Sequence, residues 1–141
     1  MKAMEIARTG MDVEWRRMDV IAENMANVNT ARTASGAPYR AMRLVSGPRP
    51  GFERALKAGD PEGLTGVASY GLEPINQEPR RAYEPENPQA DADGFVEYPG
   101  FSHAEQMTLL VKTSRAYEAD VVVMNTARQM YLRAMDLGKS S

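Results

Sequence analysis

The feature that most constrains this chain is a long stretch near its C-terminus that contains no Pro and no internal Gly. It runs from Ser102 to Gly138. Ser102 and Glu105 have the spacing of a capping box, which satisfies free N–H groups at the start of a helix. Gly138 can take the left-handed conformation that ends one. At ~1.5 Å per residue this helix would be roughly 54 Å long, so we expect it to pack against other helices.

Two apolar stripes run along this predicted helix. The first has residues three and four apart and is interrupted by Ser114 and Arg128; its members are Met107, Leu110, Ser114, Tyr117, Val121, Met124, Arg128, Tyr131 and Met135. The second runs beside it through Leu109, Ala116, Val123, Ala127, Met130, Ala134 and Leu137. One stripe is enough to pair with one helix. The second favours either an intramolecular hairpin with a wide core face or an additional surface used for assembly.

A second helix is predicted over residues 1–30. Its apolar seam consists of methionines seven residues apart, Met4, Met11, Met18 and Met25, with Ala7, Ile21 and Val28 at most of the alternate positions. Methionine seams adapt to several partners, and a helix with so few apolar residues is marginal alone. Gly10 costs about 1 kcal/mol relative to Ala within a helix, so the first turns are expected to fray or bend. This helix needs a partner.

Three asparagines mark the end of this first helix. Asn24 and Asn27 share one face, and Asn29 begins the exit from the helix. Asparagine competes with the backbone for hydrogen bonds and tolerates left-handed geometry. Composition alone therefore predicts a polar helix end followed by a turn.

The middle of the chain, residues 31–101, differs in composition. All nine prolines lie between Pro38 and Pro99. Short strands are predicted over 39–45, 66–75 and 95–98, each bounded by Pro or Gly. About forty residues would remain irregular, which is more than a free-standing compact domain usually contains. We expect this segment to be mobile or to be ordered by a neighbouring molecule.

Composition argues against most kinds of chemistry. The chain has 141 residues, a net charge of −2, no cysteine and one histidine, His103. These features exclude disulfides and thiolate chemistry, leave little for a zinc site or a catalytic triad, and give no general attraction to nucleic acid. The string from Asp91 to Gly94 has only part of a calcium-loop pattern and is better interpreted as a turn. We therefore expect no enzyme activity, no cofactor and no metal.

Nothing in the sequence predicts a membrane span or a cleaved secretory signal, because no apolar run is long enough and the N-terminus has no apolar core. Export would then require a route that recognises another feature.

Three sets of residues resemble one known family. The string Asn24-Met25-Ala26-Asn27-Val28-Asn29-Thr30 is similar to the N-terminal signature of bacterial flagellar rod and hook proteins. The run 83–96, which contains Glu84-Pro85-Glu86-Asn87-Pro88, resembles the segment before the last helix of proximal rod proteins. The strings at 105–107, 114–118 and 125–129 resemble that family's terminal helix. The chain thus resembles the bacterial flagellar basal-body rod protein family, and within it the proximal rod proteins.

This resemblance implies a fold and a function. The fold would be mainly α: terminal helices over 1–30 and 102–138 packed as an antiparallel coiled-coil pair, with a Pro/Gly-rich middle, 31–101, of loops and a few short β-strands. The function would be that of a non-enzymatic structural subunit that assembles helically and transmits torque across the periplasm. Export would use the flagellar type III apparatus, without a cleaved signal peptide. Partners would be copies of itself, other rod subunits, the ring-to-rod adaptor and that export apparatus, with no nucleic acid and no membrane insertion.

The predicted subunit interface combines seam residues of both helices with the three asparagines: Met11, Met18, Ile21, Asn24, Met25, Asn27, Asn29, Leu110, Tyr117, Val121, Met124 and Tyr131. Two alternatives remain open from sequence. One is a cytoplasmic coiled-coil adaptor that dimerises through the same stripes. The other is a small periplasmic hydrolase that uses Glu84, Glu86, Asp91 and Asp93.

Overall fold

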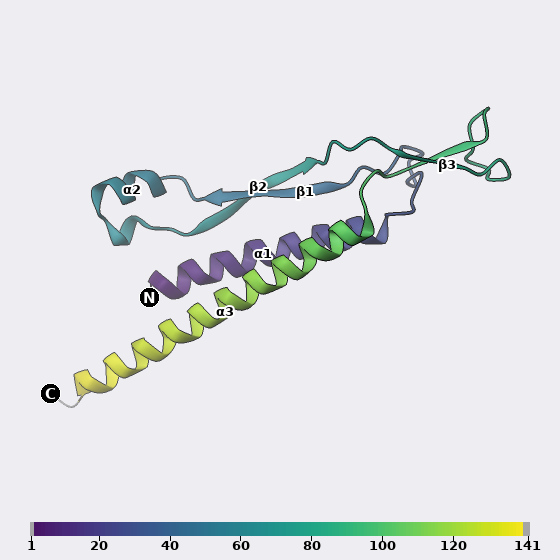
Figure 1. The fold of residues 1–141 in the computed structure, drawn as a ribbon. Coiled ribbons are helices and arrows are strands. Elements are labelled where there is room, and N and C mark those ends of the chain that lie inside the picture. Colours follow the sequence, from purple (N-terminus) through teal and green to yellow (C-terminus); the bar gives the residue numbers. More distant parts are fainter. Residues whose placement is uncertain (1, 140–141) are drawn as a thin grey trace.

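Two long helices dominate the computed structural model, which describes residues 2–139 (Figure 1). The elements in chain order are α1 (Lys2–Ala26), β1 (Met42–Pro48), α2 (Phe52–Ala58), the 3-10 turn η1 (Pro61–Gly63), β2 (Val67–Pro74), β3 (Arg80–Tyr83), β4 (Phe95–Tyr98) and α3 (His103–Lys139). The fold is therefore mainly α with a few short antiparallel strands, as the sequence predicts.

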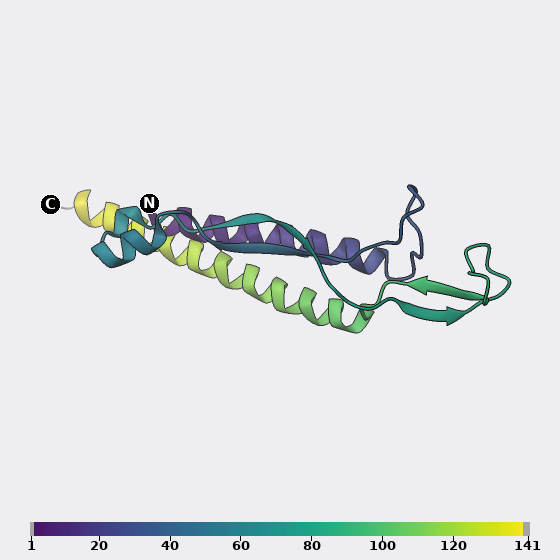
Figure 2. The same cartoon turned by 90° about the horizontal axis from the view of Figure 1, so that it is seen from above.

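The helices α1 and α3 lie side by side and run in opposite directions (Figures 1 and 2). Three contacts fix this arrangement. Asn24 hydrogen-bonds Gln106, the ring of Trp15 lies 6.3 Å from that of Tyr117, and Gly10 lies against the carboxylate of Asp120. The position in α3 rises as the position in α1 falls, so the register is antiparallel along the shared length.

The opposite side of α1 is covered by a hairpin of β1 and β2, so that α1 forms the middle layer between the hairpin and α3 (Figure 1). Side chains of α1 bond to backbone groups of both strands. Arg17 donates to Leu44 O at 3.2 Å, and Thr9 Oγ1 accepts from Val67 N at 3.0 Å. These contacts satisfy backbone C=O and N–H groups at the strand edges, which would otherwise lack a hydrogen-bond partner within the protein. The middle segment is thus ordered in part by the chain's own first helix.

The second hairpin, β3 with β4, projects beyond the end of the helix pair (Figure 1). Its strands carry two stacked cation–ring contacts, Arg80 over Tyr98 and Arg81 over Phe95. Gly100 lies where the chain returns from this hairpin to α3. A Cβ there would lie 1.8 Å from Glu78 O, so only glycine allows the two linking segments to approach this closely.

Several sequence predictions about local structure are wrong. The first helix ends at Ala26 rather than near residue 30, because the Asn27 side chain donates to Glu23 O at 2.9 Å and the backbone turns there. Gly138 does not end α3, since it lies within the helix and lacks a positive φ. Gly10 does not interrupt α1. The helix α2 was not predicted because its seven residues are too few for a clear periodicity. The strand β3 was not predicted because it begins with two arginines and has no β-branched residue.

The start of α3 agrees with the sequence prediction. Glu105 N donates to Ser102 Oγ at 3.1 Å, and Ser102 N donates to a Glu105 carboxylate oxygen at 3.3 Å. This reciprocal pair is the capping box.

Candidate subunit interface

The face between α1 and α3 combines small, polar and medium-sized side chains. Gln106, Thr113 and Ala127 are buried on α3, and Ala7 and Ile21 are buried on α1. The methionine seam of α1 is half-buried throughout. The two helices therefore enclose a thin core, and many of the larger apolar side chains of α3 are exposed instead.

Asn24 is the polar centre of this face. It is 1% exposed. Its amide nitrogen donates to Met42 O at 2.8 Å and to Gln106 Oε1 at 3.1 Å. Its amide oxygen accepts from Met42 N and from the Tyr39 hydroxyl, both at 3.0 Å. Every hydrogen-bonding atom of this buried side chain is satisfied, and the same residue connects α1, α3 and the start of β1.

Much of the outer surface of α3 is apolar and uncovered. Five positions seven residues apart lie on one side of the helix: Leu109, Ala116, Val123, Met130 and Leu137. The four large ones are 43%, 51%, 57% and 71% exposed in chain order, and Ala116 is exposed as well. We call these five residues the outer stripe. Of the second stripe predicted from sequence, Ala127 alone is buried against α1.

The two helices also differ in length. The helix α1 has 25 residues and α3 has 37. The contacts of Gly10 with Asp120 and of Asn24 with Gln106 place Lys2 opposite about residue 128 in an α-helical register. The last part of α3 therefore extends past the start of α1, as both views show (Figures 1 and 2). Tyr131, Leu132 and Met135 lie exposed on this extension.

The predicted interface residues fall into three groups. Ile21 and Asn24 are buried, Asn29 and Tyr131 are exposed, and the others are half-buried: Met11, Met18, Met25, Asn27, Leu110, Tyr117, Val121 and Met124. The structure brings Asn24 to Gln106 and Tyr117 to Trp15. Asn27 bonds to its own helix, and Asn29 accepts a long, 3.5 Å contact from Arg80.

Sequence reasoning missed several residues that build this region. Gln106 and Tyr39 bond to Asn24, and Arg17 joins α1 to β1 by donating to Leu44 O and to Ser46 Oγ at 2.7 Å. Asp120 lies on the α1-facing side of α3 against Gly10. The spacing of Gln106, Thr113, Asp120 and Ala127, each seven apart, carries the signal, but an apolar periodicity search overlooks polar residues.

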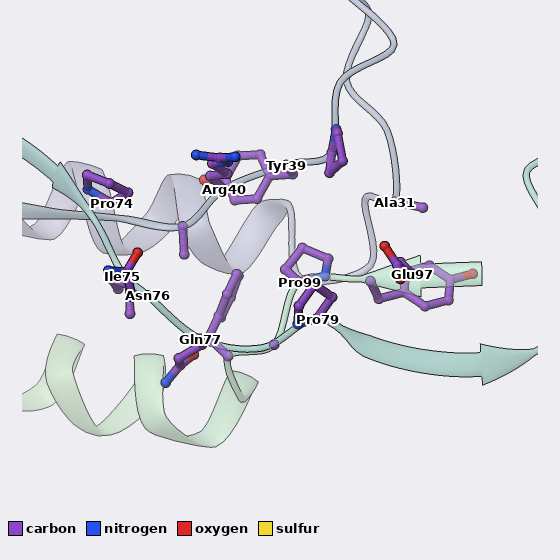
Figure 3. A pocket seen from close by; sticks show the side chains of 15 residues that line it. Ala31, Tyr39, Arg40, Pro74, Ile75, Asn76, Gln77, Pro79, Glu97 and Pro99 are labelled. Atoms are coloured by element: carbon purple, nitrogen blue, oxygen red, sulfur yellow. The ribbon is translucent and has the colours of Figure 1, made fainter. Parts of the chain in front are cut away.

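A cleft of about 330 Å³ lies where the helix pair meets the projecting hairpin (Figure 3). It is lined by residues before β1, after β2 and after β4, among them Tyr39, Ile75 and Phe101. The rings of Tyr39 and Phe101 lie 6.5 Å apart. Prolines and backbone form much of its wall, so the cleft is a packing junction between two parts of the chain.

The acidic string before β4 is a hydrogen-bonded turn. Asp91 Oδ1 accepts from the backbone N–H groups of Phe95 and Asp93 at 2.8 and 3.0 Å, and its other oxygen accepts from Arg81 at 2.7 Å. The Phe95 N–H and the Arg81 guanidinium hold the pKa of Asp91 below its ordinary value. The hydrogen bond that the Tyr98 hydroxyl donates to the Glu84 carboxylate raises the pKa of Tyr98.

Two features of the described residues bear on other functions. Within residues 2–139 no group of three or more His, Cys, Asp or Glu side chains is placed to hold a metal ion. Over the same residues, neither long helix has an apolar stretch that could cross a bilayer.

Comparison with known proteins identifies the family. A family model described as "Flagella basal body rod protein" matches residues 4–32, and one described as "Flagellar basal body rod FlgEFG protein C-terminal" matches residues 92–137. The chain is 34% identical to the flagellar basal-body rod protein FlgC of Borreliella burgdorferi, over 94% of this chain and 93% of that one.

Two further relatives carry the same name. The FlgC protein of Salmonella typhimurium is 34% identical over 96% of this chain and 95% of its own. The FlgC protein of Bacillus subtilis is 29% identical over 97% of both. With near-complete coverage and this level of identity, the chain belongs to the FlgC family of flagellar basal-body rod proteins, which are structural rather than enzymatic.

Proposed function

We propose that this chain is a structural subunit of the flagellar proximal rod that assembles helically through its terminal helices and transmits torque across the periplasm. In this proposal α1 and α3 form a coiled-coil pair, and α3 also packs against neighbouring subunits. The predicted partners are copies of this chain, other rod subunits and the ring-to-rod adaptor, with export by the flagellar type III apparatus without a cleaved signal.

The outer stripe is the observation that carries this proposal. Its four large apolar residues are between 43% and 71% exposed in the single chain. Exposed apolar stripes with a seven-residue repeat are typical of helices that pack against other helices. Contacts between unlike faces of identical subunits generate rings or open helical arrays, and a rod requires such an array. A cytoplasmic adaptor has no support from the family relationship.

The residues proposed for the subunit interface divide between the two kinds of contact. Met11, Met18, Ile21, Met25, Leu110, Val121 and Met124 would hold the coiled-coil pair together. Tyr131, on the part of α3 beyond α1, would contact a neighbouring subunit directly. Asn24 would set the register of the pair, because a buried, satisfied polar residue in a helical seam disfavours shifted alignments.

Substitution of the outer stripe tests the proposal. Val123→Asp places a charge on an exposed surface, so the fold of the single chain should survive while packing of a neighbouring helix becomes unfavourable. We expect a deletion strain that expresses this variant to be non-motile in soft agar and to lack rods by electron microscopy.

The matched control is Leu56→Asp on α2, where the side chain is also more than half exposed, at 63%. This variant should swim like the wild type. Normal motility with Val123→Asp, at wild-type protein levels, would contradict the proposal.

A further inference from the structure

Asp120 occupies an unusual position in the helix pair. Its carboxylate lies directly over Gly10, where an added Cβ would be 2.4 Å from Oδ2. The side chain is half-buried. Among residues 2–139 it takes part in no hydrogen bond and no salt bridge. A carboxylate that loses water without gaining a donor destabilises the structure that holds it.

The charged groups around Asp120 do not balance the negative charge of its carboxylate. The facing carboxylate of α1 is Glu14, and burial together with Glu14 raises the pKa of Asp120. Arg17 of α1 is already engaged, because it pairs with Glu14 at 3.0 Å and bonds to β1. Within α3, Ala116, Tyr117, Val123 and Met124 lie one turn away. This chain therefore supplies no cation to Asp120.

Asp120 also borders the outer stripe. It lies four residues after Ala116 and three before Val123, and residues at these spacings are neighbours on a helix surface. A helix that packed on the outer stripe would remove more water from Asp120. Such a contact is stable only if the incoming helix carries a basic group, because an unpaired buried charge is costly.

The same helix offers a matching surface on another side. Met107, Val111 and Val122 are 45%, 51% and 63% exposed, and Arg115 lies among them, four residues after Val111. We call these four residues the Arg115 face. Successive residues of a helix differ by about 100° in direction, so Val122 and Val123 point to different sides. Arg115 is exposed and forms no salt bridge within residues 2–139.

We propose that a second copy of this chain docks its Arg115 face on the outer stripe, with the Arg115 guanidinium paired to Asp120. This inference rests on the proposed function and names the partner of the outer stripe. Because the two faces differ, each copy can contact one neighbour through each of them. Parallel α3 helices would then pack with an offset of five residues, so that Val111 of one copy also meets Ala116 of the next.

Charge reversal tests the pairing in cells. Asp120→Arg and Arg115→Asp alone should each reduce the soft-agar swimming diameter to below a tenth of wild type, because each juxtaposes like charges. The double variant should restore at least half of it, because the pair is re-formed in the opposite sense. Asp19→Arg, at an exposed acid of α1, serves as the control and should swim normally. Motile single variants, or a double variant that stays non-motile, would overturn the inference.

Cross-linking tests the offset in assembled rods. The chain has no native cysteine, so Val111→Cys with Ala116→Cys introduces the only two thiols. Five residues of helix separate them by roughly 7.5 Å along the axis, too far for a disulfide within one chain. Oxidised hook–basal bodies should give covalent dimers on a non-reducing gel, and neither single variant should. Absence of dimers from assembled rods would contradict the contact.

The two proposals fail differently. If Val123→Asp blocks assembly while Asp120→Arg is silent, the outer stripe is an assembly surface but its partner is not the Arg115 face. If Val123→Asp is itself silent, both proposals fall.

Discussion

The two long helices of this protein differ in how much of their surface the chain itself covers. α1 lies between the β1–β2 hairpin and α3, and its side chains bond to both hairpin strands (Figure 1). α3 touches α1 along one side and leaves the outer stripe and its C-terminal extension exposed. The covered helix therefore accounts for the fold of the single chain. The other carries the exposed surface that we propose neighbouring subunits cover.

Three consecutive valines of α3 make this comparison testable with one kind of substitution. Val121 is half-buried and lies one turn after Tyr117, whose ring contacts Trp15 of α1. Val122 is exposed on the Arg115 face, and Val123 belongs to the outer stripe. An aspartate at each position adds the same charge to a different side of the same helix turn. Effects on stability and on assembly can therefore be separated.

The largest effect is expected at Val121. Val121→Asp removes an apolar contact and places a carboxylate between the helices, near Glu14 and Asp120. The free energy of unfolding should fall by about 3 kcal/mol, at the upper end of the usual range for single substitutions. Urea unfolding followed by circular dichroism measures this, and assembly should be lost as well.

Val122→Asp provides the comparison for stability, since a change at an exposed position usually alters stability by no more than about 0.5 kcal/mol. Equal unfolding midpoints for the two variants would mean that Val121 does not face α1 in solution.

An intermediate effect is expected at Asn24. Asn24→Ala leaves Gln106, Tyr39 and Met42 without their shared buried partner. The cost of leaving buried polar groups unsatisfied predicts a loss of about 2 kcal/mol in the free energy of unfolding. Asn29→Ala, at an exposed residue with one long contact, should change it by less than about 0.5 kcal/mol. If the two variants unfold alike in urea, Asn24 does not connect the layers.

The smallest effect is expected in the projecting hairpin, which neither helix covers. The pKa of Asp91 is lowered in the folded turn, so its ionised form stabilises the turn. This contribution is complete above the unfolded value of about 3.9 and is lost as pH falls through the lower, folded value. Acidification should therefore lower the protection factor of the Phe95 amide hydrogen, which NMR gives as the intrinsic exchange rate at that pH divided by the observed rate, and leave the helices intact.

Asp91→Asn should lower the same protection factor already at neutral pH. A Phe95 protection factor that neither acid nor this substitution changes would show that Asp91 does not hold the turn.

The sequence predicts the parts of the fold that depend on local residues. The capping box of Ser102 and Glu105 and the absence of Pro place α3 correctly, and turn residues confine the strands to the middle segment. The second apolar stripe of α3 suggested a surface in addition to the one that packs against the first helix. Its exposure in the structure favours the assembly interpretation over a wide intramolecular core.

The contacts that organise the layers could not be predicted, because they join residues far apart in the chain. Asn24 is 82 residues from Gln106, and nothing in either neighbourhood indicates the pair. Gly10 suggested a weak point in the first helix, yet it is the residue that lets the Asp120 carboxylate lie against α1. Short elements such as α2 carry too few residues for a clear periodicity.

Quantitative mass spectrometry of purified hook–basal bodies tests the central claim most directly. Bodies would be prepared from wild-type cells and from cells that express Val123→Asp in place of the native chain. We predict that the wild-type chain is present in amounts comparable with other rod subunits, and that the variant cells yield rings without a rod and without this chain. Intact rods that contain the Val123→Asp chain at wild-type amounts would contradict the claim that the outer stripe of α3 builds the rod.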